Sequence, residues 1–286
     1  TKFPTVFDLA GADEAVVLRY WEGLGYYRRA RQLHAAAKLI VSDYKGIFPQ
    51  DACALRQLPG VGRYTAGAIA SISFDLPEPI LEANSRRVLA RFIHYDTPLS
   101  GNKDDQPLWD VAAAIVPRDG GAGAFNQALM DLGSIICTPV SPRCEECPLA
   151  DHCEAYQLGS VDRIPNAPAR KSSKKIKEKA YVFIHKGKLL VVRRQPGEWW
   201  EGLWDFPRGI PNQVAARGRQ RDLGTIDYSV TYHKVTCQIL STFVSQRPAA
   251  RRHQRWLSPQ EIQKLPMTSP GRRIVVLAEK HFSREG

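Results

Sequence analysis

The sequence of 286 residues has no long apolar run and no internal repeat. A membrane-spanning helix needs roughly 20 consecutive apolar residues, and no segment approaches that length. No signal peptide is visible, and two of the cysteines, Cys53 and Cys237, stand alone in unlike segments. These absences argue against a membrane protein, a repeat protein and a disulfide-rich secreted protein, so we expect a cytoplasmic protein.

The charge is strongly positive overall, at +11, but it is unevenly distributed along the chain. Residues 1–156 hold 15 Lys and Arg against 19 Asp and Glu, a net charge of −4. Residues 157–180 hold 7 against 2, net +5, and residues 181–286 hold 18 against 8, net +10. Such a balance favours a polyanionic partner, of which nucleic acid is the commonest, although a basic surface can also serve solubility alone.

The first part of the chain lacks the alternation of apolar and polar residues that marks strands. Asp13 can cap a helix that stops near Gly23, and apolar residues then repeat at helical spacing from Tyr27 to Tyr44. We therefore predict a mainly α domain over residues 1–156. Its further helices are expected over residues 51–57, 64–73, 85–93, 106–115 and 124–136.

The composition changes after this domain. Residues 157–179 are rich in Pro, Ser, Arg and Lys, which is typical of a solvated basic linker. Beyond it, residues 180–184 and 189–193 flank a turn and predict a β-hairpin. Residues 228–244 alternate like a long strand or a second hairpin, and residues 259–264 and 272–282 look helical. We therefore predict a second domain of α+β class over residues 180–286.

Four cysteines lie within seventeen residues, at intervals of six, two and five residues. They are Cys137, Cys144, Cys147 and Cys153. Four thiolates in one loop can hold a single iron-sulfur cluster or a zinc ion. Structural zinc sites usually draw their ligands from two short knuckles, whereas only one pair here has that spacing. The pattern favours a 4Fe-4S cluster, with zinc and disulfides as the alternatives.

A glycine-containing turn, Leu58-Pro59-Gly60-Val61-Gly62, lies between two predicted helices. The two glycines, Gly60 and Gly62, allow a tight turn with outward N–H groups, and the next helix begins at once. This arrangement suits a phosphate of a DNA backbone, and an ordinary turn between helices is the alternative. It is the signature of a helix-hairpin-helix motif.

The hairpin together with the downstream cysteine loop resembles the endonuclease III-like DNA base-excision glycosylases. The resemblance covers residues 3–153 and implies a helix-hairpin-helix glycosylase domain with a 4Fe-4S cluster bound by the four cysteines. Further details resemble one branch, the A/G-specific adenine DNA glycosylases (MutY). In that branch the motif Gly23-Leu24-Gly25-Tyr26-Tyr27-Arg28-Arg29-Ala30-Arg31 supplies a wedge that enters the duplex.

The resemblance implies a role for individual residues of these motifs. Leu24 and Tyr26 are expected at the lesion, whereas Arg28 and Arg31 would contact phosphates. Tyr64 stands where the bifunctional endonuclease III branch has a lysine that attacks the sugar. A phenol cannot form a Schiff base, so we expect a monofunctional enzyme in which Tyr64 orients the target sugar.

Three more residues match the pocket of the adenine-specific branch. Gln127 occupies the position that contacts the extruded adenine, and a carboxamide presents both a donor and an acceptor to its edge. Glu82 stands where the family has an aspartate that stabilises positive charge on the sugar, and Asn84 matches beside it. Glu82 adds a methylene, so its carboxylate must shift by about 1 Å, an offset that can be costly.

The general acid of the family lies on a helix upstream of the stretch that Thr1 begins. We therefore expect that the N-terminal part of the glycosylase domain is missing and that this fragment alone is inactive or severely impaired. The second domain resembles the Nudix-like domain of adenine glycosylases. Residues 217–224 hold one acid, Asp222, so pyrophosphohydrolase activity is not expected. His233, in Thr231-Tyr232-His233, matches a motif that reads 8-oxoguanine, although the family's serine is replaced.

These interpretations lead to one preferred function and two alternatives. We expect a monomeric base-excision repair enzyme that removes adenine mispaired with 8-oxoguanine or guanine in double-stranded DNA. It would contain a 4Fe-4S cluster and work in the cytoplasm, associated with the nucleoid. The alternatives are an endonuclease III-like pyrimidine glycosylase with lyase activity, and a lesion-binding protein that has lost much of its catalysis.

Overall fold

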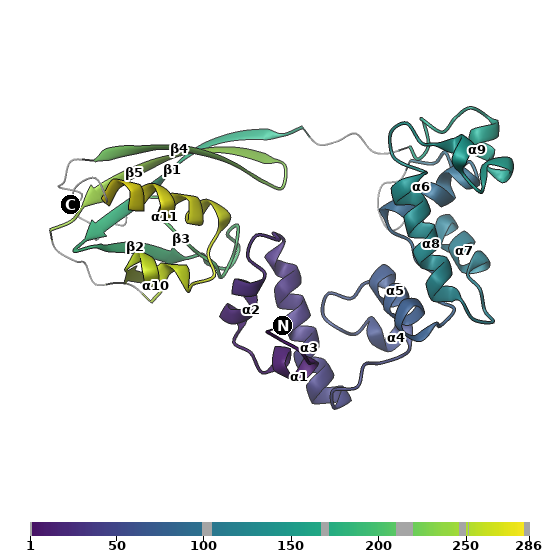
Figure 1. The fold of residues 1–286 in the computed structure, drawn as a ribbon, viewed down its shortest axis with the longest axis horizontal. Coiled ribbons are helices and arrows are strands. Elements are labelled where there is room, and N and C mark those ends of the chain that lie inside the picture. The colour runs from purple at the N-terminus through teal and green to yellow at the C-terminus, as the bar shows by residue number, and fades with distance from the viewer. Residues whose placement is uncertain are drawn as a thin grey trace. The chain divides into compact units, whose positions relative to one another are not determined.

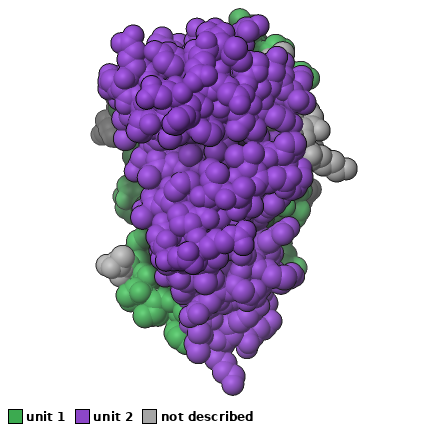
Figure 2. Space-filling view, turned by 90° about the vertical axis from the view of Figure 1, so that its right-hand side faces the viewer, with its two compact units in different colours: residues 1–34, 171–286 green, residues 35–170 purple. Residues whose placement is uncertain are grey.

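The computed structural model describes residues 2–98, 105–166, 172–209, 220–245, 250 and 252–282. The chain forms two compact units that interleave in sequence, residues 1–34 with 171–286, and residues 35–170. Figure 2 colours the first unit green and the second purple. Among the described residues, no helix combines the length and the apolar character that crossing a membrane requires.

The unit of residues 35–170 is helical, as the sequence predicts. It contains the end of α3 (Tyr27–Tyr44) and the helices α4 to α9, with two short 3₁₀ turns in the cysteine loop. Five predicted helices are confirmed to within two residues at each end. The elements are α4 (Ala52–Leu55), α5 (Arg63–Phe74), α6 (Ala83–Phe92), α7 (Gln106–Ile115), α8 (Ala122–Ile135), η1 (Cys144–Glu146), η2 (Ala150–His152) and α9 (Glu154–Gln157).

The core of this helical unit forms around α6, α7 and α8. Leu89, Leu108 and Leu129, one from each helix, belong to one buried cluster. Cys137 and Cys153 pack against the same cluster, so the cysteine loop is part of the core and not a separate appendage. Burial of these side chains supplies the hydrophobic stabilisation that short helices lack by themselves.

The other unit contains a mixed sheet (Figure 1). Its strand order is β3-β2-β1-β5-β4, and β6 also pairs with β2. β1 and β5 run parallel, from the pair Lys174 and His233 onward, whereas β4 and β5 form an antiparallel hairpin. The strands are β1 (Lys174–His185), β2 (Lys188–Arg193), β3 (Trp204–Asp205), β4 (Arg221–Val230), β5 (His233–Phe243) and β6 (Gln254–Leu257).

Helices cover one face of this sheet. Ile239 of β5 packs in a buried cluster with Ile274 and Ala278 of α11 (Ser269–Phe282) and with Ile262 of α10 (Pro259–Gln263). Figure 1 shows α11 lying across the strands. A second cluster, which includes Phe183 and Trp256, is built from the intervening strand positions because neighbouring side chains of a strand point to opposite faces. The predicted α+β class is confirmed.

Both predicted hairpins are present. β1 and β2 are joined by Lys186-Gly187, which both have positive φ angles, 45° and 73°. That backbone suits a two-residue hairpin turn. The alternation over residues 228–244, which allowed a long strand or a hairpin, belongs to the hairpin of β4 and β5.

Part of the predicted linker is a strand, which corrects the boundary at residue 179. β1 begins at Lys174, and its residues from Lys174 to Lys179 pair in register with β5. The charged side chains there alternate with partly buried ones such as Ile176 and Glu178. Backbone pairing with a strand sixty residues downstream therefore decides this segment, whereas its local charge indicated a linker.

The N-terminal helices α1 (Val6–Ala10) and α2 (Glu14–Tyr20) also differ from the predicted division at residue 156. They belong to the same compact unit as the sheet. Leu18 and Tyr27 share a buried cluster with Leu203, and Glu22 accepts two hydrogen bonds from Arg272 at 2.6 and 3.0 Å. These contacts join residues far apart in sequence, which periodicity along the chain cannot reveal.

Candidate functional site

The predicted hairpin forms between α4 and α5. Gly60 has a φ of 82°, a value that favours glycine, and the Val61 N–H donates to the Leu58 carbonyl at 3.1 Å. Gly62 is the N-cap of α5, no side chain caps this end, and a Cβ at Gly62 would meet nothing within 4 Å. The first N–H groups of α5 are thus open to an anion, which is the predicted property of the motif.

Tyr64, on the first turn of α5, lies near Glu82. Its hydroxyl donates to the Met130 sulfur at 3.6 Å, and its ring packs on the core around α6 and α8. Burial raises the pKa of Tyr64, and the negative charge of Glu82 raises it further. The phenol therefore stays a neutral hydrogen-bond donor at physiological pH, beside a carboxylate.

Glu82 is the N-cap of α6. One carboxylate oxygen, Oε1, accepts from the Asn84 N–H at 2.8 Å and from the Ser85 N–H at 2.9 Å. In return, the Glu82 N–H donates to the Ser85 hydroxyl at 2.8 Å, which completes a capping box. The additional methylene is accommodated by folding the carboxylate back over its own helix, so the carboxylate is held in place.

Asn84 is connected to the cysteine loop through an arginine that the sequence analysis missed. Arg87, buried on α6, donates to the Asn84 side-chain carbonyl at 2.9 Å, to the Gly133 carbonyl at 2.5 Å and to the Cys137 carbonyl at 2.6 Å. A buried cation needs such partners, since it loses its hydration. An arginine at an otherwise apolar helix position was the sequence signal that could have identified it.

Gln127 lies on α8 and is exposed. Its amide nitrogen donates to the Gly123 carbonyl of its own helix at 3.3 Å. Among the described residues, no hydrogen bond joins Gln127 to Tyr64, Glu82 or Asn84, so its contact with adenine stays a prediction. Its neighbour Asn126 is buried and ties α8 to α5, because it donates to the Ser71 hydroxyl at 2.8 Å.

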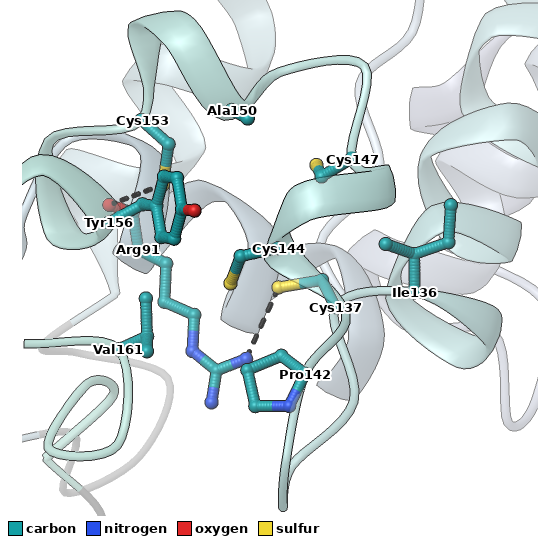
Figure 3. Close-up of a pocket in the computed structure, with 10 residues that line it drawn as sticks. All are labelled: Arg91, Ile136, Cys137, Pro142, Cys144, Cys147, Ala150, Cys153, Tyr156 and Val161. Carbon is teal, nitrogen blue, oxygen red and sulfur yellow. Dashed lines mark hydrogen bonds between the residues drawn. The ribbon is translucent and has the colours of Figure 1, made fainter. Parts of the chain in front are cut away.

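The four cysteines line one cavity of about 30 Å³ together with Arg91 (Figure 3). Arg91 donates to the Cys137 sulfur at 3.3 Å, and the Cys153 thiol donates to the Arg91 carbonyl at 3.6 Å. Burial raises the pKa values of Cys144 and Cys153, and the charges of the other cysteines raise them further. Four such thiolates need a metal centre to compensate their charge, so the donor set fits one.

The described residues contain no group of three or more His, Cys, Asp and Glu side chains placed to hold a single metal ion. The four cysteine side chains line the same cavity. Arg143, in the cysteine loop, pairs with Glu146 at 2.7 Å. It also donates to the Ile135 carbonyl at 3.1 Å.

The predicted wedge residues belong to the unit that contains the sheet. Leu24 is 68% exposed and Tyr26 is 77% exposed, so both can contact another molecule. Tyr27 is buried, as expected of a core aromatic residue, and burial raises its pKa. The exposure of Tyr26 agrees with a wedge but does not test it.

Arg28 and Arg31 differ in their surroundings. Arg28 is exposed and can approach a phosphate. The Arg31 guanidinium lies 3.6 Å from the Glu14 carboxylate. One of its terminal nitrogens lies only 2.7 Å from the position that a Cβ atom at Gly202 would take. A phosphate contact of Arg31 stays a prediction, and it would compete with the Glu14 pair.

His233 begins β5 in an aromatic surrounding. Its ring centroid lies 5.1 Å from that of Trp199 and 4.2 Å from that of Tyr232, and the Thr231 hydroxyl is 3.4 Å from Nδ1.

Asp222 accepts from the Gln238 amide at 2.6 Å, and residues 217–219 of the segment compared with a Nudix motif lie outside the described residues. Trp199 is a residue that the sequence analysis missed.

Three sequence families match separate parts of the chain. Residues 1–113 match the HhH-GPD superfamily of base excision DNA repair proteins, and residues 137–153 match the iron-sulfur binding domain of endonuclease III. Residues 179–277 match the NUDIX domain. The cysteine loop is therefore an iron-sulfur binding domain, and the architecture predicted from the sequence is confirmed.

The chain is similar to several adenine DNA glycosylases and to a solved DNA glycosylase of another specificity. The adenine DNA glycosylase of Buchnera aphidicola subsp. Acyrthosiphon pisum is 35% identical over 209 residues, 72% of this chain and 59% of the relative. That of Mus musculus is 30% identical over 344 residues, 98% of this chain and 67% of the relative. A solved thermostable thymine-DNA glycosylase is 32% identical, with a TM-score of 0.49, covering 55% of this chain and 72% of that one. The chain spans between 40% and 59% of the first three adenine glycosylases compared. It belongs to the adenine DNA glycosylase family.

Proposed function

We propose that this chain is the base-excising and lesion-reading part of an adenine DNA glycosylase. Its substrate is adenine mispaired with 8-oxoguanine or guanine in double-stranded DNA, and it acts as a monomer in the cytoplasm. The observation that supports this most directly is the pair of Tyr64 and Glu82 behind the hairpin, within the segment that matches base excision repair proteins. The chemistry of that pair suits hydrolysis of a glycosidic bond.

The reaction breaks the bond between adenine and C1′ of the sugar. Positive charge develops on the sugar as the purine leaves, and a carboxylate beside it stabilises that charge. Glu82 supplies this carboxylate, and two backbone hydrogen bonds to its Oε1 atom hold the side chain in place. Asn84, held by Arg87, positions the attacking water or the sugar. Water adds to C1′ and loses one proton, and the leaving purine takes up one proton, so the products are free adenine and a sugar with a hydroxyl group at C1′.

Tyr64 makes the enzyme monofunctional. Its neutral phenol can donate a hydrogen bond to the sugar but cannot form an imine, so no strand cleavage by β-elimination proceeds through it. Gln127 reads the adenine edge, and the hairpin of Gly60 and Gly62 binds a phosphate of the backbone.

The other unit contributes contacts outside the reaction itself. Leu24 and Tyr26 enter the duplex and offset the cost of unstacking, and Arg28 and Arg31 contact phosphates. His233 reads the base opposite the adenine. Residues 1–156 form the glycosylase domain, and the Nudix-like domain follows the basic linker. The last residues of that linker, from Lys174 onward, belong to strand β1.

Cys137, Cys144, Cys147 and Cys153 hold a 4Fe-4S cluster. The cluster contributes a covalent cross-link of the loop and no step of the reaction. Within this chain, the loop fixes the end of α8. The Cys137 carbonyl accepts a hydrogen bond from Arg87, which in turn bonds to Asn84, so the loop also fixes these two side chains.

The test is adenine release by the full-length protein. Duplexes with A·8-oxoguanine, A·G, A·T and thymine glycol are incubated with excess enzyme, and free bases are quantified, with borohydride added in parallel. We expect adenine release from the first two duplexes and no trapped covalent adduct, whereas a Tyr64→Lys variant introduces the amine that trapping needs.

Release of thymine glycol alone, or a borohydride adduct with the wild type, would favour a pyrimidine glycosylase with lyase activity. Binding of mispairs without release would favour a lesion-binding protein, which the engaged oxygen of Glu82 makes the second candidate.

A further inference from the structure

Arg91 is a buried cation that the reaction described above does not use. It lies on α6 with 2% of its surface exposed, and it lines the cavity of about 30 Å³ together with the four cysteines. Figure 3 shows its guanidinium beside Cys137 in this cavity. An arginine loses its hydration when it is buried, so the partners that it gains there must compensate that loss.

Three contacts hold the guanidinium of Arg91 in one position. Its Nε donates to the Ile164 carbonyl at 2.8 Å, and its Nη1 donates to the Thr138 carbonyl at 2.8 Å. The same Nη1 atom donates to the Cys137 sulfur at 3.3 Å. The rigid fork of an arginine meets acceptors in fixed directions, which a lysine ammonium on a flexible stem does not reproduce. The positive charge is therefore fixed against a sulfur of the cysteine loop.

These contacts satisfy the N–H groups of Arg91 but do not neutralise its charge. The acceptors are two carbonyl oxygens and one sulfur, and in the described part of the chain no carboxylate forms an ion pair with Arg91. Arg86, on the same helix, has the usual partner for an arginine, because it pairs with the Asp105 carboxylate at 2.7 Å. A buried cation without an anion is costly, so the compensating negative charge is expected in the cysteine cavity.

An iron-sulfur cluster bound by four thiolates supplies that negative charge. The charges of four thiolates outweigh the positive charge of a 4Fe-4S core in its usual oxidation states, so the bound cluster is an anion. Two of the four cysteines contact Arg91 directly, since the Cys153 thiol also donates to the Arg91 carbonyl at 3.6 Å. The cation and the ligand set are thus parts of one arrangement.

The position of this cation affects how readily the cluster loses an electron. The reduction potential of an iron-sulfur centre depends on its net charge, on hydrogen bonds to its sulfurs and on its exposure to solvent. A fixed positive charge with an N–H group directed at a ligand sulfur stabilises the reduced state, which carries more negative charge, over the oxidised state. Transfer of one electron from the cluster to an oxidant therefore becomes less favourable, and so does the loss of iron that follows oxidation.

We propose that Arg91 is the charge partner of the cluster, that it raises the reduction potential of the cluster, and that it thereby protects the cluster from one-electron oxidation and loss of iron. Arg91 is a positioning residue and not a catalytic residue, because it acts on the cluster through Cys137. This inference rests on the 4Fe-4S cluster of the proposed function, and it adds a residue outside the four ligands that controls the redox state of the cluster.

The experiment uses the full-length protein purified without oxygen. Iron and sulfide are quantified, and the midpoint potential of the cluster is measured by titration with redox mediators, followed by absorbance and electron paramagnetic resonance. Arg91→Met and Arg91→Gln remove the charge, and the glutamine keeps a donor for the carbonyl acceptors, whereas Arg91→Lys keeps the charge. Arg143→Gln is the control, because Arg143 belongs to the same loop but is exposed and pairs with Glu146. Arg87 remains in every variant.

We expect both neutral variants to have a lower midpoint potential than the wild type, with a change of about tenfold in the redox equilibrium, which is about 59 mV for a one-electron couple. Arg91→Lys and Arg143→Gln should stay well within that shift. When ferricyanide accepts one electron from each cluster, the neutral variants should release iron to a chelator about 10- to 100-fold faster than the wild type, as loss of a residue that supports a metal ligand commonly does.

A wild-type potential in the neutral variants would overturn the inference even where they contain less iron, because a purely structural arginine changes loading and not the potential of the clusters that remain. If neither neutral variant holds a cluster, the loading of Arg91→Lys decides: wild-type loading supports the role of the charge, and equal loss in all three variants refutes it. The iron and sulfide content of the wild type separates this inference from the proposed function. A loaded wild type with unchanged potentials in the variants would refute the role of Arg91 alone, whereas a wild type without iron would refute the proposed cluster as well.

Discussion

At the scale of single residues, Glu82 combines a structural and a chemical role. The same Oε1 atom that caps α6 belongs to the carboxylate proposed to stabilise the sugar cation. The cap fixes the side chain before substrate arrives, so little reorganisation is needed during the reaction. A glutamate can occupy the family's aspartate position because the helix end holds its longer side chain.

Glu82→Gln separates the two roles. Glutamine keeps a carbonyl oxygen for the cap but has no charge, so adenine release in a single turnover should fall about 10²- to 10³-fold. The thermal unfolding midpoint should change little. Glu82→Ala, the control, also removes the cap and should destabilise the protein by about 1 kcal/mol. Wild-type release rates in Glu82→Gln would show that the carboxylate does not take part in the reaction.

At the scale of secondary-structure elements, the close approach of α6 and α8 positions the proposed site. Gly133 allows the contact, because a Cβ there would lie 2.7 Å from the Asn84 Cβ and 2.9 Å from its carbonyl oxygen. Arg87 bonds to the Gly133 carbonyl at the same crossing. The crossing therefore sets the position of Asn84 relative to the end of α8.

Gly133→Ala should force the two helices apart. Although alanine favours a helix, the contact with backbone atoms cannot be relieved by a side-chain rotation, so we expect a net destabilisation of about 1–3 kcal/mol. Adenine release should decrease as well, because Asn84 moves. Ser134→Ala, at the exposed neighbouring position, serves as the control and should leave the unfolding free energy within about 0.5 kcal/mol of the wild type. Equal stability of both variants would contradict the tight crossing.

At the scale of the whole molecule, the two compact units have separate cores. One core combines the sheet with α10 and α11, and the other combines α6, α7 and α8 with the cysteine loop. Cys137 and Cys153 pack against the helical core, so a centre bound by the cysteines stabilises that unit and not the other.

Removal of iron should therefore lower the unfolding temperature of the helical unit by more than about 5 °C and leave that of the sheet-containing unit unchanged. Calorimetry of iron-loaded and iron-depleted protein measures both transitions. Cys144→Ser should lose the iron and the same stabilisation, whereas Cys53→Ser, at an exposed cysteine outside the loop, should lose neither. An iron-depleted protein with an unchanged helical transition would refute the structural role of the cluster.

Much of the architecture could be predicted because its signals are local. The helix over residues 27–44, the hairpin with Gly60 and Gly62 and the cysteine intervals all depend on consecutive or nearly consecutive residues. The prediction failed at residues 174–179, where the composition indicates a linker but β5 supplies a pairing partner. It also missed Arg87 and Trp199, whose partners lie between 3 and 50 residues away in the sequence.

The sequence alone thus determined the two kinds of fold, the family resemblance and the four cysteines proposed as ligands, because spacing and residue type encode them. The tertiary structure decided which side chains are free to act. It showed Arg31 and Arg143 engaged with acidic neighbours, Glu82 folded onto its own helix, and Tyr26 beside Trp199 and Trp200 in one cavity. Such contacts depend on how distant segments pack, which a one-dimensional pattern does not contain.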